Sequence, residues 1–149
     1  MRWFVCYSIR HCDLQASVCE NQRNCFLPMR KKVVVLEDDK DIREIITYVL
    51  EACDIQVVGY ETLSGFLSSA KPYDADLILL DLMLPDGSGR EACYHLQQDE
   101  LTAKIPIIMM SAYIEGIRAN GCKPVDFISK PFDIDDFVHR ITARLKTES

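Results

Sequence analysis

The chain has 149 residues, 48% of them hydrophobic and 27% charged, which is the composition of a globular protein with one sizeable core. Its formal net charge is −6, and no basic stripe is present. The charge excludes nucleic acid as the default direct partner, and we expect no insertion into a membrane.

The first 30 residues differ from the rest of the chain. They carry four arginines against one aspartate and one glutamate, and they show no sustained hydrophobic periodicity. We interpret residues 1–30 as an N-terminal extension, either disordered or produced by a mis-annotated upstream start codon, ahead of a domain over 31–149. The alternative is a redox or docking segment.

Four of the seven cysteines lie in this extension, at Cys6, Cys12, Cys19 and Cys25. Gaps of five or six residues between them do not give the close ligand pairs of a zinc site. The segment also lacks the apolar stretch of a secretory signal. We therefore expect a reduced, cytoplasmic protein in which the remaining cysteines, Cys53, Cys93 and Cys122, are small apolar residues.

From residue 31 onward, short apolar runs alternate with segments of helical periodicity. Strands are predicted at 33–36, 55–60, 76–81, 105–111 and 125–129. Helices are predicted from the apolar spacing of Ile42, Ile45, Ile46, Val49 and Leu50, over 62–70, from Ser88 to about Gln98, and from Ile134, Phe137, Val138, Ile141 and Leu145. This alternation predicts a parallel sheet with helices on both faces.

The segment between the fourth and fifth strands is a poor helix former. Its sequence, "YIEGIRANGCKP", contains Gly116, Gly121 and Pro124, and these residues disfavour a helix interior. We expect the fourth helix of the alternating pattern to be shortened or irregular.

Polar side chains gather where the predicted strands end. They are Glu37, Asp38 and Asp39 after the first strand, Asp81 after the third, Ser111 after the fourth and Lys130 after the fifth. The carboxyl ends of parallel strands form the edge where ligands bind in such sheets. Crowded carboxylates repel one another, and one lysine cannot neutralise them. An all-oxygen set of this kind implies Mg²⁺, and a carboxylate can accept a phosphoryl group.

Four segments, "VVVLEDDKDIREII", "LILLDLMLPDGSG", "IPIIMMSA" and "FISKPF", together resemble the CheY-like receiver domain of two-component response regulators. The resemblance covers residues 31 to about 147. It implies a doubly wound α/β fold, flavodoxin-like, with a five-stranded parallel sheet in the order 2-1-3-4-5.

By position in these motifs, Asp81 resembles the phosphoacceptor, and Glu37 with Asp38 resembles the acidic pair that binds Mg²⁺. Asp38 and Asp81 would bind the ion directly, Glu37 through water, and the backbone carbonyl of Met83 would be a further ligand. Asp39 falls one place beyond the pair, where it would be solvated or would cap a helix.

The resemblance also implies roles in switching and in the lifetime of the phosphorylated state. Ser111 resembles the switch hydroxyl, Lys130 the phosphate-binding lysine, and Phe127 the aromatic residue that changes rotamer, although a core position would also explain Phe127. Met83 and Tyr113 would flank the hydrolytic water. Neither side chain can orient that water, so we expect slow self-dephosphorylation.

The sequence therefore predicts a stand-alone receiver that takes a phosphoryl group from a sensor histidine kinase or a histidine phosphotransfer protein onto Asp81. It would then bind a partner or relay the group, and would catalyse only its own phosphorylation and dephosphorylation. Alternatives are an aspartyl-phosphate hydrolase, a phosphorylation-independent interaction module, and a receiver fragment of a larger hybrid protein. Such hydrolases commonly carry an aspartate where this chain has Met83, which disfavours the first.

Overall fold

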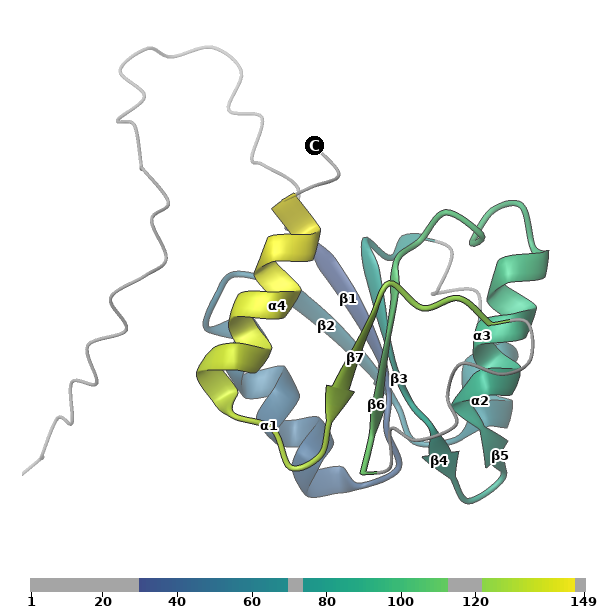
Figure 1. The fold of residues 1–149 in the computed structure, drawn as a ribbon, viewed down its shortest axis with the longest axis horizontal. Coiled ribbons are helices and arrows are strands. Elements are labelled where there is room, and N and C mark those ends of the chain that lie inside the picture. The colour runs from purple at the N-terminus through teal and green to yellow at the C-terminus, as the bar shows by residue number, and fades with distance from the viewer. Residues whose placement is uncertain (1–29, 70–73, 113–121, 147–149) are drawn as a thin grey trace, which may run out of the picture.

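A five-stranded parallel sheet forms the centre of the protein in the computed structural model, which describes residues 30–69, 74–112 and 122–146 (Figure 1). Its strands are β1 (Lys32–Leu36), β2 (Gln56–Tyr60), β3 (Leu77–Asp81), β6 (Ile107–Ser111) and β7 (Asp126–Ser129). They are arranged in the order β2-β1-β3-β6-β7. Counting only these five strands, this is the predicted order 2-1-3-4-5, and the flavodoxin-like fold is confirmed.

Burial on both faces explains why the strands are continuous apolar runs. All four residues from Val33 to Leu36 and all four from Leu77 to Leu80 are fully buried. The edge strand β2 is covered less completely and contains the exposed Gly59. The predicted strands agree with the observed ones to within two residues at each end.

Helices of the described part of the chain lie on both faces of the sheet (Figure 1). Helices α1 (Lys40–Glu51) and α4 (Ile134–Lys146) pack against the side chains that Val33 and Val35 present on one face. Helices α2 (Leu63–Leu67) and α3 (Gly89–Gln98) pack against Val34 and Leu36 on the other. Successive strand residues point to opposite faces, so each strand contributes to both halves of the core.

Two helical predictions need correction. Helix α2 ends at Leu67, short of the predicted residue 70, and it includes Ser64 and Gly65, which favour helix weakly. Ile45 was expected on the buried face of α1, but its side chain is 47% exposed. The apolar stripe of α1 is therefore wider than the sheet that it covers.

A short hairpin follows the third strand and was not among the predicted elements. It pairs β4 (Met83–Leu84) with β5 (Gly87–Ser88) around Asp86. The Asp86 carboxylate accepts hydrogen bonds from the backbone N–H groups of Leu63 and Ser64, both at 2.9 Å. These bonds favour the charged form and lower the pKa of Asp86, so a charged side chain joins the hairpin to the start of α2.

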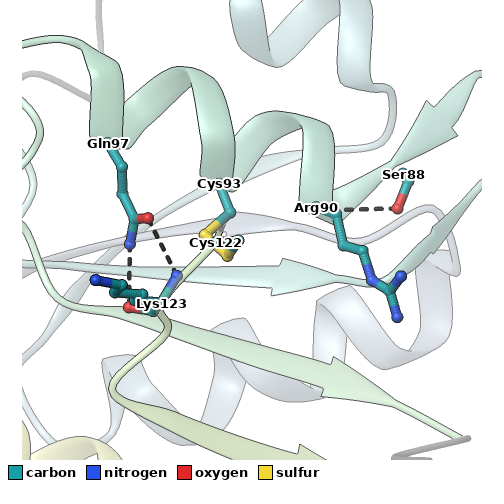
Figure 2. The surroundings of a disulfide bond; sticks show 6 residues. All are labelled: Ser88, Arg90, Cys93, Gln97, Cys122 and Lys123. Atoms are coloured by element: carbon teal, nitrogen blue, oxygen red, sulfur yellow. Dashed lines mark hydrogen bonds between the residues drawn. A yellow bond between two sulfur atoms is a disulfide. The ribbon is translucent and has the colours of Figure 1, made fainter. Parts of the chain in front are cut away.

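The expectation of a reduced protein with small apolar cysteines is wrong for Cys93 and Cys122, because the two form a disulfide (Figure 2). Their Cα atoms are 5.8 Å apart although 29 positions separate them in the chain, a distance that no local pattern encodes. Beside the disulfide, Gln97 donates to the carbonyl of Lys123 (3.0 Å) and accepts from its N–H (3.1 Å). The segment that leads into β7 is thus attached to α3 covalently and by hydrogen bonds. Cys53, by contrast, packs half-buried against the core.

Some predictions concern residues outside the described ranges. They are the extension up to residue 29, most of the segment expected to hold the shortened fourth helix, and Tyr113. Among the helices that the structure does describe, none has the length and apolar character needed to cross a membrane.

Candidate functional site

The acidic loop between β1 and α1 is held at both ends. Glu37 directly follows β1; its N–H donates to the carbonyl of Tyr60 (2.9 Å), and the residue is fully buried. Asp38 comes next and is exposed. Asp39 then caps α1, accepting from the N–H groups of Asp41 (2.9 Å) and Ile42. This outcome confirms one of the two alternatives predicted for Asp39.

Asp81 ends β3, and its carboxylate lies close to those of Glu37 and Asp38. Its Oδ2 is 2.7 Å from the Nζ of Lys130, and its Oδ1 accepts a hydrogen bond from the N–H of Met83 (3.2 Å). The same Lys130 ammonium lies 2.5 Å from Oε2 of Glu37. One lysine therefore joins carboxylates that are 93 and 49 residues away from it in the chain.

Ser111 and Lys130 are brought together by the pairing of β6 with β7. The backbone N–H of Lys130 donates to the carbonyl of Ser111 (2.9 Å), and Ser111 is 2% exposed. The peptide bond between Lys130 and Pro131 is cis. The polar residues that were predicted at the carboxyl edge of the sheet therefore lie there. They are at or directly after the ends of β1, β3, β6 and β7.

The acidic side chains and Lys130 change one another's pKa values. Burial raises the pKa of Glu37 to about 7, and the negative charge of Asp81 acts in the same direction, whereas Lys130 opposes the rise. Burial also disfavours the charged form of Lys130, but Asp81 and Glu37 outweigh that effect and its pKa is raised. An ammonium group therefore lies beside a Glu37 carboxyl that is protonated more readily than that of a free glutamate.

The donor set fits a hard divalent cation. Glu37, Asp38 and Asp81 each offer a carboxylate oxygen, and these oxygens lie within 4.8 Å of one another. If all three acids are ionised, Lys130 leaves two negative charges unbalanced, which is the charge of one divalent cation. Oxygen ligands and a partly open position suit Mg²⁺, which keeps several waters.

Met83, Phe127 and Tyr113 are the remaining predicted residues. The side chain of Met83 is 69% exposed in the hairpin that follows Asp81. Phe127 is half-buried, packs against the core on the face of α2 and α3, and pairs in register with Met109. Tyr113 cannot be placed, because it lies outside the described residues.

Gly89 is a supporting residue that the sequence analysis did not identify. A Cβ atom at this position would lie 2.1 Å from the backbone carbonyl oxygen of Asp81. The N–H of Gly89 donates to the carbonyl of Leu82 (3.2 Å), and so does the hydroxyl of Ser88 (3.1 Å). The start of α3 is thus pressed against the strand end that carries Asp81. A glycine directly after the helix cap was the only signal in the sequence.

The sheet order and the acidic rim at its carboxyl edge define a doubly wound α/β protein of the flavodoxin-like class. The response regulator receiver domain family matches residues 33–142, which is most of the chain. The chain therefore belongs to the receiver domain family of response regulators.

Curated relatives support this assignment. The chain is 36% identical over 121 residues to the phosphate regulon transcriptional regulatory protein PhoB of Escherichia coli, covering 79% of this chain and 53% of PhoB. It is 34% identical over 125 residues to the DNA-binding response regulator MtrA of Mycobacterium leprae, covering 79% and 52%. The chain spans about half the length of the curated relatives it matches.

Solved structures show the same fold at lower identity. A putative response regulator from Chloroflexus aurantiacus aligns with a TM-score of 0.69 at 24% identity, covering 78% of this chain and 98% of that one. The receiver domain of the sensor histidine kinase PA1611 from Pseudomonas aeruginosa, solved with magnesium in its active-site cleft, aligns with a TM-score of 0.69 at 21% identity, covering 78% and 98%.

Membership of the family carries general properties. Receiver domains are signalling domains rather than classical enzymes, they bind Mg²⁺, and they generally interact with histidine kinases or phosphotransfer proteins. The acidic cluster of Glu37, Asp38 and Asp81 is consistent with such a phosphoacceptor and Mg²⁺ site.

Proposed function

We propose that Asp81 accepts a phosphoryl group from a phosphohistidine on a sensor kinase or a phosphotransfer protein. The phosphorylated chain then binds a protein partner or passes the group on. The observation that carries this proposal is the position of Lys130, whose ammonium contacts both Asp81 and Glu37 at the carboxyl edge of the sheet. We also propose a cytoplasmic location, where a phosphohistidine donor would meet the chain.

In the proposed reaction, a carboxylate oxygen of Asp81 attacks the phosphorus atom of the phosphohistidine. A phosphorus–oxygen bond forms, the phosphorus–nitrogen bond breaks, and its electron pair returns to the imidazole nitrogen. The N–H of Met83 orients the carboxylate through Oδ1. The Lys130 ammonium, which contacts Asp81, stabilises the negative charge of the incoming phosphoryl group. In this proposal the Ser111 hydroxyl donates to a phosphoryl oxygen.

The acidic pair and Asp81 would hold Mg²⁺ in this proposal. Asp38 and Asp81 would be direct ligands together with the backbone carbonyl of Met83, and Glu37 would act through water. When bound, the ion supplies the charge that draws the phosphoryl oxygens towards Asp81. The buried position of Glu37 suits an indirect ligand, because it also contacts Lys130.

The function is tested by labelling the full chain with a small acyl phosphate in the presence of Mg²⁺ and mapping the label by mass spectrometry. We expect one phosphoryl group on Asp81, none without Mg²⁺, and none in Asp81→Ala. Label on another residue, or labelling that survives in Asp81→Ala, would assign the phosphoacceptor elsewhere. A folded wild type that takes no label would instead favour a phosphorylation-independent interaction module.

Calorimetry on neighbouring acids tests the metal site. Mg²⁺ binding should be lost in Asp38→Ala and Asp81→Ala, and Mg²⁺ should raise the melting temperature of the wild type by mass action. Asp39→Ala is the matched control, since its carboxylate caps α1 and removing it costs about 1 kcal/mol of stability while leaving Mg²⁺ binding intact. Unchanged binding in the first two variants would contradict the assignment.

We further propose that Met83 and Tyr113 slow the hydrolysis of the phosphorylated state. Met83 is exposed beside Asp81, and its thioether cannot orient a water for in-line attack. Met83→Asn should shorten the lifetime of the acyl phosphate by about tenfold, the effect of one orienting group worth ~1.4 kcal/mol. The decay is followed by loss of radiolabel. Equal rates in the two proteins would leave Met83 important only through its backbone.

Ser111 and Phe127 form the proposed switch. In this proposal the Ser111 hydroxyl follows the phosphoryl group, and the half-buried ring of Phe127, two residues before the partner of Ser111 in β7, changes its rotamer. The ring resonances of Phe127 should shift on phosphorylation in the wild type and should not shift in Ser111→Ala. Identical spectra before and after labelling would make Phe127 a core residue only.

A further inference from the structure

The guanidinium of Arg43 donates hydrogen bonds to the backbone of the acidic pair, Glu37 and Asp38. Arg43 lies in α1, and its Nη1 donates to the carbonyl oxygen of Glu37 at 2.6 Å and to that of Asp38 at 3.2 Å. The carbonyl groups of two successive residues are thus held by one charged donor. Hydrogen bonds from a cation are shorter and stronger than those between neutral groups.

The position of Arg43 is fixed by two further contacts. Its Nη2 lies 3.6 Å from Oε2 of Glu61, just beyond the end of β2, and only 18% of its side chain is exposed. The aliphatic part of the side chain crosses Gly59 of β2, where an added Cβ would lie 2.9 Å from Cδ and 3.2 Å from Cγ. Arg43 can therefore adopt this course because position 59 has no side chain.

We propose that Arg43 is a positioning residue for the acidic pair, acting on the carbonyl groups of Glu37 and Asp38 and touching neither carboxylate. By fixing these two peptide groups it keeps both side chains directed towards Asp81. The inference rests on the proposed Mg²⁺ and phosphoryl chemistry of that site. Groups that orient metal ligands without binding the metal are commonly worth 10- to 100-fold in metal affinity.

Arginine is needed at this position because of its geometry. A planar guanidinium presents several N–H groups in a fixed fork and can serve two carbonyl groups and a carboxylate together. A lysine ammonium keeps the charge, but its flexible stem holds a single donor atom. Arg43→Lys should therefore recover only part of the Mg²⁺ affinity that Arg43→Met loses.

The test uses the full chain and measures Mg²⁺ affinity by calorimetry in variants first shown to be folded by circular dichroism. Arg43→Met should bind Mg²⁺ at least tenfold more weakly. Arg144→Met is the control for charge, since Arg144 also donates to a backbone carbonyl, that of Val125 (3.2 Å). Val125 directly precedes β7 and so lies at the amino edge of the parallel sheet, whereas the acidic pair follows β1 at the carboxyl edge. Arg144→Met should bind as the wild type does.

Gly59→Ala provides a second, independent approach to the same contact. Its methyl group should displace the Arg43 side chain and weaken Mg²⁺ binding in the wild-type background. In an Arg43→Met background, the same change should have no further effect, because the side chain that it displaces is already gone. Equal losses in both backgrounds would show that Gly59 acts without Arg43 and would overturn this part of the inference.

Amide hydrogen exchange separates this inference from the proposed function. In Arg43→Met, the N–H groups of Glu37 and Asp39 should exchange faster than in the wild type and in Arg144→Met. A wild type that binds no Mg²⁺ would sink the proposed metal site, and exchange alone would then decide the role of Arg43. Unchanged exchange, wild-type Mg²⁺ affinity in Arg43→Met, or equal weakening in Arg144→Met would each overturn the inference.

Discussion

Gly89→Ala should destabilise the protein and displace the proposed phosphoacceptor together. The added methyl carbon would lie 2.1 Å from the carbonyl oxygen of Asp81 and 2.9 Å from its carbonyl carbon. These are backbone atoms of a central buried strand, so no side chain can rotate away to make room. Overpacking of a core commonly costs about 1–3 kcal/mol, and we expect a loss at or above the upper end of that range.

The Gly89→Ala change should also affect phosphorylation, because the contact joins the start of α3 to the end of β3 that carries Asp81. If the helix moves to admit the methyl group, Gly89 and Ser88 lose their hydrogen bonds to Leu82. If the strand moves instead, Asp81 shifts relative to Lys130. Either adjustment should slow labelling of Asp81 in protein that is still folded.

Gly65→Ala is the matched control for this prediction. A Cβ at Gly65 would meet only the Oγ1 of Thr62, at 2.9 Å, and this hydroxyl can rotate away at the cost of its cap bond to the Gly65 N–H, about 1 kcal/mol. Alanine in turn favours helix over glycine by about 0.5–1 kcal/mol, so this variant should be close to neutral. Chemical denaturation of both variants measures the difference, and a Gly89→Ala protein within about 1 kcal/mol of the wild type would show that the contact relaxes freely.

The sequence was informative wherever function and burial leave a local pattern. Continuous apolar strands such as Val33–Leu36 require cover on both faces, and the structure has that cover. A charged residue directly after an apolar strand marks the end of that strand. Because the carboxyl ends of parallel strands share one edge of the sheet, the sequence alone placed Asp81 and Lys130 at the same edge. The helix that was predicted from Ser88 is present as α3, with Ser88 as its cap.

What could not be predicted depends on contacts between distant segments. The lack of room for a methyl group at Gly89, the course of Arg43 across Gly59 and the pairing of Cys93 with Cys122 all follow from how elements pack. None of them produces a period of two or of 3.6 in the chain. The residues that support the site were therefore missed, although the sequence analysis had singled out the three acids and the lysine that the structure brings together.

Reduction of the Cys93–Cys122 disulfide should lower the stability of the domain substantially. The bond closes a loop with a sequence separation of 29, and the loop-entropy relation gives about 3–4 kcal/mol for that length. For a domain of this size, the melting temperature should fall by on the order of 10 °C. Thermal unfolding with and without a thiol reductant measures the change, and alkylation followed by mass spectrometry counts the thiols released.

Two variants assign that effect to this bond. Gln97→Ala removes the paired hydrogen bonds to Lys123 and should cost about 1–2 kcal/mol while leaving the response to reductant intact. Cys122→Ala should melt like the reduced wild type and should no longer respond to reductant, because Cys93 then has no partner. A Cys122→Ala protein that remains sensitive to reductant would place the stabilising disulfide among the other cysteines. The connection between α3 and the start of β7 would then depend on Gln97 rather than on a covalent bond.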